Sequence, residues 1–182
     1  MKKIFIGLFL VFFVQISVAQ ISRTIYGVTL GMEYKTLIKS LKRNHVKYID
    51  WIEDNDKCNF ITINSGTPFC GVSWLFTSAY FREGKVNEIR FTDIVHDEEL
   101  SYKMLSSYQE ICALLKTKYE SYGKDFDFKE VDDGANAMLY LSDGKTDVTF
   151  ILIYRPNGES KMQLQYEDVT WKQSSNKMLE EI

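Results

Sequence analysis

The sequence has few histidines and cysteines, and it has none of the short motifs on which common enzyme classes depend. Its 182 residues include two histidines and three cysteines, and neither His45 nor His96 has a partner at zinc-site spacing. The acidic stretch from Asp125 to Gly134 lacks the regular spacing of a calcium loop, which favours a strand followed by a solvated turn. A G-x-S-x-G elbow, a G-x-G-x-x-G loop, a P-loop and an H-E-x-x-H helix are all absent. We therefore expect no metal, no cofactor and no enzymatic activity, unless two of the 25 acidic residues meet from separate loops.

The sequence also lacks an excess of positive charge. Lys and Arg total 22 against 25 Asp and Glu, and no basic cluster stands out. A protein without such a cluster has little with which to release counterions from a phosphate backbone, so we expect no nucleic-acid partner. The chain is 45% hydrophobic and 26% charged, which is typical of an ordinary globular domain and not of a disordered or repetitive chain.

The first 20 residues have the pattern of a secretory signal peptide. Two lysines precede an apolar run from Ile4 to Val14, and the small-x-small pattern Ser17-Val18-Ala19 predicts cleavage after Ala19 or Gln20. The alternative is a membrane anchor, but the run is shorter than the roughly 20 residues that a spanning helix needs. No cysteine near the cleavage site is available for lipid attachment. We therefore expect a periplasmic or secreted protein without a transmembrane anchor. Without residues 1–20, 20 basic residues face 25 acidic ones, a net charge of −5.

The three cysteines have different expected roles. Cys58 and Cys70 flank a turn region, so in an oxidising compartment they are candidates for a disulfide, with two free thiols as the alternative. Cys112 lies on the apolar stripe of a predicted helix. This position favours a small buried hydrophobic residue over a reactive thiol.

Two amphipathic helices are predicted from the spacing of apolar residues. The stripe of the first consists of Tyr34, Leu37, Ile38 and Leu41. The second helix is predicted over 98–122, with acidic residues at its start and Gly123 as its stop. Its stripe consists of Met104, Tyr108, Ile111, Leu115, Tyr119 and Tyr122.

Between the two helices the sequence predicts β-hairpins, of which the clearest turns at Glu83-Gly84. A two-residue loop there pairs Arg82 with Lys85 and fixes which side chains share a face. One side then carries Trp74, Phe76, Tyr80, Ile89 and Phe91. The other side carries Leu75, Ala79, Phe81 and Val86.

The last third of the chain predicts a three-stranded meander. Its strands are joined by a two-residue Asp143-Gly144 loop and a three-residue Pro156-Asn157-Gly158 loop, with Gly158 in the left-handed conformation. The three-residue loop is preferred because a two-residue Asn157-Gly158 loop would mix apolar and polar faces. The apolar face consists of Leu139, Leu141, Val148, Phe150, Leu152, Tyr154, Met162, Leu164 and Tyr166.

These elements predict a single α+β domain over 21–171, with pseudo-halves 21–95 and 96–171. The order is a helix with three or four strands and then a helix with three strands. Since each half has one apolar sheet face and one amphipathic helix, the simplest arrangement is a continuous antiparallel sheet with both helices packed on one face. The stretch 172–182 follows as a polar tail.

Two short stretches resemble known exported domains. The pattern Gly31-Met32-x-x-x-x-Leu37-x-x-x-Leu41 resembles the opening of bacterial envelope domains of the outer-membrane assembly lipoprotein and β-lactamase-inhibitor-protein type. Gly66-Thr-Pro-Phe69-Cys-Gly71 is similar to a pattern in uncharacterised exported proteins of Gram-negative gut-type bacteria. The resemblance covers about residues 27–41 and 66–91. It implies a non-enzymatic envelope domain that binds proteins through loops or an open sheet face, although the lipoproteins' acylated cysteine is missing here. No binding residue is carried over.

The sequence therefore predicts an exported binding module whose partner is another envelope or secreted protein, or a second copy of this chain. The candidate surface is the sheet side opposite the predicted core: Leu75, Phe81, Val86, Met138, Tyr140, Ile151 and Ile153. The N-terminal segment or the tail would alternatively cover these residues. The alternative function is a small-molecule or glycan site in a cleft between the halves, lined by residues from the set Trp51, Trp74 and Trp171.

Overall fold

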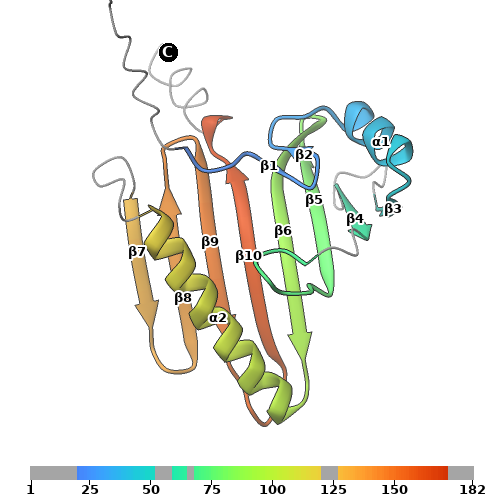
Figure 1. Cartoon of the computed structure of the whole chain (residues 1–182). Coiled ribbons are helices and arrows are strands. Elements are labelled where there is room, and N and C mark those ends of the chain that lie inside the picture. Colours follow the sequence, from blue (N-terminus) through green and yellow to red (C-terminus); the bar gives the residue numbers. More distant parts are fainter. Residues whose placement is uncertain (1–19, 52–58, 65–67, 120–126, 172–182) are drawn as a thin grey trace, which may run out of the picture.

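The residues that the structure describes form an eight-stranded antiparallel sheet, a separate two-stranded hairpin and two helices (Figure 1). The computed structural model describes residues 20–51, 59–64, 68–119 and 127–171. The predicted signal peptide up to Ala19 and the polar tail 172–182 lie outside these residues. The predicted fold class, α+β with an antiparallel sheet, is confirmed.

Each helix is followed by a meander of four strands. The helices are α1 (Tyr34–Arg43) and α2 (Glu98–Tyr119). The strands are β1 (Thr24–Ile25), β2 (Val28–Thr29), β3 (Lys47–Asp50), β4 (Phe60–Asn64), β5 (Phe76–Arg82), β6 (Lys85–Val95), β7 (Asp127–Asp132), β8 (Asn136–Ser142), β9 (Thr146–Ile153) and β10 (Ser160–Asp168). β1 and β2 form the hairpin, and the large sheet has the order β3-β4-β5-β6-β10-β9-β8-β7. The last strands of the two meanders, β6 and β10, therefore pair at the centre of the sheet. The edge strand β7 confirms the strand predicted in the acidic stretch 125–134, and it gives the second meander four strands and not the three that were counted there.

α1 packs its predicted apolar stripe against the β3–β5 end of the sheet. Leu37 and Leu41 are buried, and the ring of Tyr34 meets the ring of Phe81 edge-on, with centroids 5.3 Å apart. The hydroxyl of Tyr34 also donates a hydrogen bond to the carboxylate of Asp50 on β3, which raises the pKa of Tyr34 to about 12. The helix is thus fixed to both the core and the edge strand.

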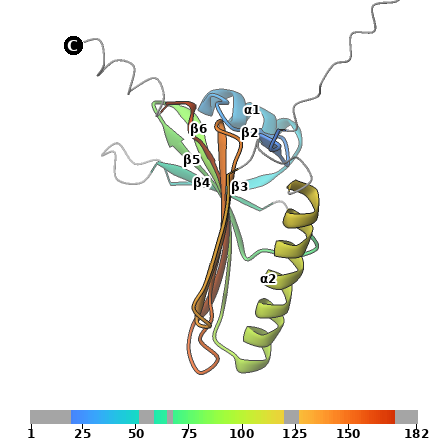
Figure 2. The same cartoon turned by 90° about the vertical axis from the view of Figure 1, so that its left-hand side faces the viewer.

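α2 lies across β8, β9 and β10 on one side of the sheet (Figures 1 and 2). Its buried stripe contains Met104, Tyr108, Ile111, Cys112, Leu115 and Tyr119, as predicted. Tyr108 packs on Phe150 of β9 with ring centroids 4.5 Å apart. The carboxylate of Asp97 accepts a hydrogen bond from the backbone N–H of Leu100 and so caps the start of the helix. The predicted last turn, with Tyr122 and Gly123, lies outside the described residues. We call the side of the sheet that carries the helices the inner face and the opposite side the outer face.

An aromatic cluster fills the inner face between the two helices. Phe69, from the segment before β5, stacks on Phe91 of β6 with centroids 4.5 Å apart. Tyr26 of the β1–β2 turn meets both rings edge-on. Trp74 packs against Phe91 and Phe150. The small hairpin and the segment before β5 therefore close the core where neither helix covers it.

The predicted register between the last two strands is confirmed. Phe150 pairs with Leu164 and Leu152 with Met162, as a three-residue loop over 156–158 requires. All four side chains are buried on the inner face. Gly158 itself does not have a positive φ, so its predicted left-handed conformation is wrong.

The loop between β8 and β9 is longer than predicted. Ser142 pairs with Asp147, so four residues stand between the paired positions and not two. The carboxylate of Asp143 closes this loop by accepting hydrogen bonds from the backbone N–H groups of Lys145 and Thr146, at 3.0 and 2.7 Å. Because the change is a shift of two residues, each side chain keeps its predicted face.

The β5–β6 hairpin contains a β-bulge that the predicted register did not include. The Glu83-Gly84 loop is confirmed, and Phe81 pairs with Val86 as predicted. The next pair joins Tyr80 to Glu88, so Asn87 is an extra residue on β6. Without the extra residue, odd-numbered and even-numbered side chains of β6 would keep to opposite faces along the whole strand. With it, the side chains of β6 beyond Asn87 lie on the face opposite to the one that the simple alternation predicts, relative to β5.

The bulge overturns the predicted faces of this hairpin. Phe81 and Val86, predicted on the outer face, are 6% and 0% exposed on the inner face, together with Phe91. Phe76 and Tyr80, predicted in the core, lie on the outer face, and Phe76 is 46% exposed. The physical reason is that α1 buries Phe81 near the loop end of the hairpin, while the aromatic cluster buries Phe91 near its other end, both on the inner face. A regular register would place these two side chains on opposite faces.

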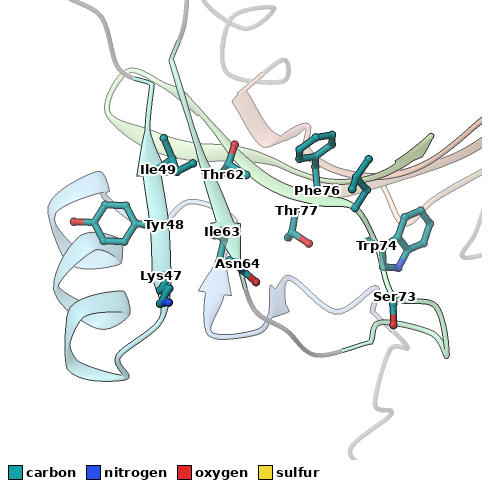
Figure 3. A pocket seen from close by; sticks show the side chains of 11 residues that line it. Lys47, Tyr48, Ile49, Thr62, Ile63, Asn64, Ser73, Trp74, Phe76 and Thr77 are labelled. Atoms are coloured by element: carbon teal, nitrogen blue, oxygen red, sulfur yellow. The ribbon is translucent and has the colours of Figure 1, made fainter. Parts of the chain in front are cut away.

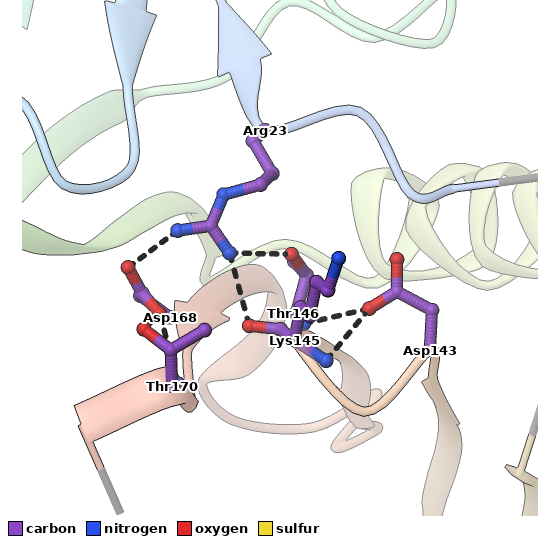
Figure 4. Close-up of polar contacts among 6 residues, drawn as sticks. All are labelled: Arg23, Asp143, Lys145, Thr146, Asp168 and Thr170. Atoms are coloured by element: carbon purple, nitrogen blue, oxygen red, sulfur yellow. Dashed lines mark hydrogen bonds and ion pairs between the residues drawn. The ribbon is translucent and has the colours of Figure 1, made fainter. Parts of the chain in front are cut away.

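A polar cluster ties the N-terminal segment to the end of the sheet (Figure 4). Arg23 forms a salt bridge with Asp168 and donates hydrogen bonds to the carbonyl of Lys145, at 3.0 Å, and the hydroxyl of Thr146, at 3.2 Å. The carboxylate of Asp168 also accepts hydrogen bonds from the N–H and the hydroxyl of Thr170. Burial opposes ionisation of Asp168, but the hydrogen bonds from Thr170 and Arg23 outweigh it and keep the pKa of this carboxyl below its usual value.

We expect Asp168→Asn to lower the free energy of unfolding by about 1 to 2 kcal/mol at neutral pH, because it removes the charge that Arg23 faces. Since the folded pKa lies below the unfolded value of about 3.9, the contribution is present above about pH 4 and is lost as the pH falls through the folded pKa. Urea unfolding of both proteins at pH 7 and near pH 3 measures this. Glu110→Gln, which neutralises an exposed acid on α2, is the control and should cost less than about 0.5 kcal/mol. An equal loss for Asp168→Asn at both pH values would contradict the assignment.

Candidate functional site

The outer face of the sheet is the candidate site, because no described helix or strand packs over it (Figure 2). The cross-strand pairs arrange its side chains in rows. One row, from β3 to β7, consists of Ile49, Thr62, Ser78, Arg90, Gln165, Thr149, Tyr140 and Lys129. The next row, from β5 to β7, consists of Phe76, Thr92, Gln163, Ile151, Met138 and Val131. Large apolar side chains therefore alternate with threonine and glutamine on a broad surface.

Four of the seven predicted surface residues lie on the outer face and are partly exposed: Met138, Tyr140, Ile151 and Ile153. Leu75, just before β5, is 55% exposed. Phe81 and Val86 do not belong to the surface, because the bulge turns them into the core. The predicted facing of the side chains is thus confirmed on β8 and β9 and is wrong for Phe81 and Val86.

The outer face also carries exposed apolar residues that the sequence analysis did not assign to it: Ile49, Phe76 and Val131. With Trp51, they make up four of the eight large hydrophobic residues that are exposed in the described part of the chain. Asp50 between Ile49 and Trp51 was a readable signal that these two side chains share one face of a strand. Phe76 had no such signal, because its face depends on the bulge.

Three aromatic rings stack in a row across the β3 edge of the outer face. Trp51 stacks on Phe60, with centroids 6.2 Å apart, and Phe60 stacks on Tyr80, at 5.0 Å. The guanidinium of Arg90 continues the row at 4.3 Å from the ring of Tyr80, and it donates a hydrogen bond to the Tyr80 hydroxyl. The indole N–H of Trp51 donates to the hydroxyl of Thr62 at 3.2 Å. These contacts hold the rings in place without a covering element, which lowers the entropic cost of binding to them.

Arg90 also pairs with a carboxylate close to this row. Glu88 is 8% exposed, and its Oε1 lies 2.6 Å from the guanidinium of Arg90. Burial raises the pKa of Glu88, and the charge of Arg90 opposes that shift. Glu88 pairs across the strands with Glu167, which pairs in turn with Asp147. The outer face is therefore acidic along this row.

The three tryptophans of the alternative prediction lie in separate places. Trp51 is on the outer face and is 47% exposed. Trp74 is half-buried at the inner-face cluster, and its indole N–H donates to the carbonyl of Phe69 at 3.0 Å. Trp171 lies just beyond β10, where the guanidinium of Arg82 is 3.4 Å from its ring centroid. The three side chains line no common cavity in the described part of the chain.

A pocket, which we call the corner pocket, opens where β4 ends and the chain enters β5 (Figure 3). Its volume is about 630 Å³, within the range of small-molecule sites. The apolar wall consists of Ile49, Ile63, Trp74, Leu75 and Phe76. Of the described residues that line it, Lys47 is the one that carries a charge. Of the three tryptophans predicted for a cleft, Trp74 lines this pocket, together with residues of β3, β4 and β5.

Neither described cysteine is placed as a reactive centre. Cys70 lies on an exposed turn and forms no disulfide with a described residue, and because Cys58 lies outside the described residues their predicted disulfide stays a prediction. Cys112 is buried on α2, as predicted. Burial raises the pKa of its thiol to about 11, which keeps the thiol protonated at neutral pH.

Comparison with protein-family models, with curated proteins and with solved structures found no match. The resemblance to exported envelope domains therefore stays an expectation, and no residue role is transferred from a relative. Over the described ranges, no helix is both long and apolar enough to cross a membrane. The same residues contain no group of three or more His, Cys, Asp or Glu arranged to hold a metal ion. The candidate site is thus defined by geometry: the outer face with its aromatic row, and the corner pocket beside it.

Proposed function

We propose that this chain is an exported, non-enzymatic module that binds another protein through the outer face of its sheet. The observation that carries the proposal is a sheet face with exposed apolar rows and no covering element among the described residues. An antiparallel sheet with one solvated face usually has polar side chains there. Clustered large apolar groups on such a face mark a contact site. The signal-peptide pattern of residues 1–20 supports export to the periplasm or the outside of the cell.

The composition of the outer face favours a protein as the partner. Interfaces between proteins are enriched in aromatic residues, methionine and arginine. Trp, Tyr and Arg are also the residue types that most often dominate binding energy, and Trp51, Tyr80 and Arg90 stand together in the aromatic row. The acidic row at Glu88 and Glu167 disfavours nucleic acid.

Site-specific photo-crosslinking in native envelope extract tests this proposal. A photoreactive residue at Ile151, in the middle of the outer face, should crosslink the full chain to one protein partner. The matched control places the same residue at Leu114, which is 61% exposed on α2. We expect no product from that position. A product of twice the chain's mass would identify the partner as a second copy.

A charge placed on the outer face supplies a second readout. Phe76→Lys should abolish the crosslinked product while the variant still unfolds at the urea concentration of the parent, since Phe76 is already half-exposed. Equal crosslinking from Ile151 and Leu114, or an unchanged product in Phe76→Lys, would rule out the outer face as the binding surface.

A second candidate function is the binding of a small molecule or glycan, and the corner pocket favours it. The pocket has the volume and the largely apolar wall of a ligand site. It replaces the predicted cleft of three tryptophans as the place where such a ligand would bind.

A further inference from the structure

We propose that the corner pocket binds a small apolar molecule with one negative charge, of the class of aliphatic carboxylic acids. This inference rests on the second candidate function and does not depend on protein binding by the outer face. The apolar wall of the pocket, the charge of Lys47 and the volume support this class of ligand.

The wall of the pocket is apolar and exposed. Ile49 is 56% exposed, Leu75 is 55% exposed and Phe76 is 46% exposed, and all three line this one pocket. The ring of Trp74 also lines the pocket, and its indole N–H donates a hydrogen bond to the carbonyl of Phe69. Burying such apolar surface against a ligand removes it from water, which favours binding. An aliphatic or aromatic body therefore gains affinity here, and it needs no hydrogen bond from the tryptophan.

Among the described residues that line the pocket, the charge is positive and has no counterpart. Lys47 is the sole charged residue in this described lining, and none of the others there is acidic. Within the described ranges Lys47 forms no salt bridge. Thr62 and Asn64 add polar groups from β4. A ligand with one carboxylate matches this arrangement, because its charge meets the ammonium of Lys47 while its body lies on the apolar wall.

The volume limits the size of the ligand. A volume of about 630 Å³ lies within the range of small-molecule sites, so the pocket suits a ligand of the size of a medium-length aliphatic acid. Figure 3 shows Ile49, Thr62 and Phe76 directed to one side of the strands, where the wall meets the outer face. The open side of the pocket leaves room for the head group in water.

Calorimetric titration of the full chain with two probes of equal length tests the proposal. The probes are dodecanoate, below its critical micelle concentration, and uncharged dodecan-1-ol. We expect saturable binding of one dodecanoate per chain. Lys47→Gln should weaken dodecanoate binding about two- to fivefold, the range for a solvent-exposed ion pair, and leave dodecan-1-ol unaffected. Phe76→Ser should weaken both probes about equally. Lys42→Gln, on the exposed side of α1, is the control and should change neither.

The outcomes separate the ligand class from the second candidate function. If both probes bind with the same affinity and Lys47→Gln changes neither, the pocket is a ligand site but the charge assignment is overturned. If neither probe shows saturable binding, both the ligand class and the small-molecule function are overturned. Crosslinking from Ile151 in the outer-face experiment is unaffected by either result.

Discussion

Replacing Phe91 by alanine should lower the free energy of unfolding by about 3 to 5 kcal/mol, the usual range for a fully buried aromatic side chain. Phe91 is 0% exposed and stands at the centre of the sheet on β6. Its ring stacks on Phe69 and contacts Tyr26 and Trp74. The substitution therefore opens a cavity where the hairpin, the segment before β5 and the sheet meet. Urea unfolding followed by circular dichroism measures the loss.

Phe76→Ala is the matched control, since it removes the same side chain from the other face of the same hairpin. Phe76 is 46% exposed, so we expect a loss below about 1 kcal/mol. The contrast between the two variants tests the assignment of faces directly. Similar losses from both would mean that the outer face is a second buried layer and not a free surface.

Phe81→Ser should also destabilise the protein by about 3 to 5 kcal/mol, because the bulge at Asn87 places Phe81 in the core. Phe81 is 6% exposed, and its ring packs edge-on against Tyr34 of α1. Serine at this position would leave a cavity and bury a hydroxyl. Thermal unfolding monitored by calorimetry, together with urea titration, gives the size of the effect.

Ile151→Ser provides the comparison, because sequence alone assigned Ile151 and Phe81 to the same outer surface. Ile151 lies on the outer face of β9 and is partly exposed, so its loss should cost about 1 kcal/mol or less. A small effect of Phe81→Ser would show that the register without the bulge is the correct one. In that case Phe81 would return to the binding surface.

The β9–β10 and β5–β6 hairpins show how much of the fold could be predicted from the sequence. The β9–β10 register followed from loop length and from strict alternation, and Phe150 pairs with Leu164 as expected. Both determinants are local, so the sequence contains them. In the β5–β6 hairpin the loop was equally clear, but the extra residue at Asn87 carries no sequence signature. Its presence is decided by which side chains α1 and Phe69 bury.

The candidate site was predicted only in part, for the same reason. Met138 and Ile151 lie on the outer face because their alternation is uninterrupted. The aromatic row needs three strands to meet: Trp51 follows β3, Phe60 is on β4 and Tyr80 is on β5. Because the three residues belong to three different segments, no spacing pattern in the sequence could predict that their rings stack. The corner pocket likewise joins β3, β4 and the entry to β5.

Patterns in the sequence were enough to predict the α+β class, the stripes of α1 and α2, and the inner face of the last three strands. These follow from apolar periodicity and loop length, which act over a few residues. The bulge at Asn87, the pairing of β6 with β10 and the uncovered outer face became visible only in the folded chain. These depend on contacts between residues far apart in the chain. The free energy of burying Phe81, Phe91 and their neighbours selects one arrangement among several that local sequence permits equally.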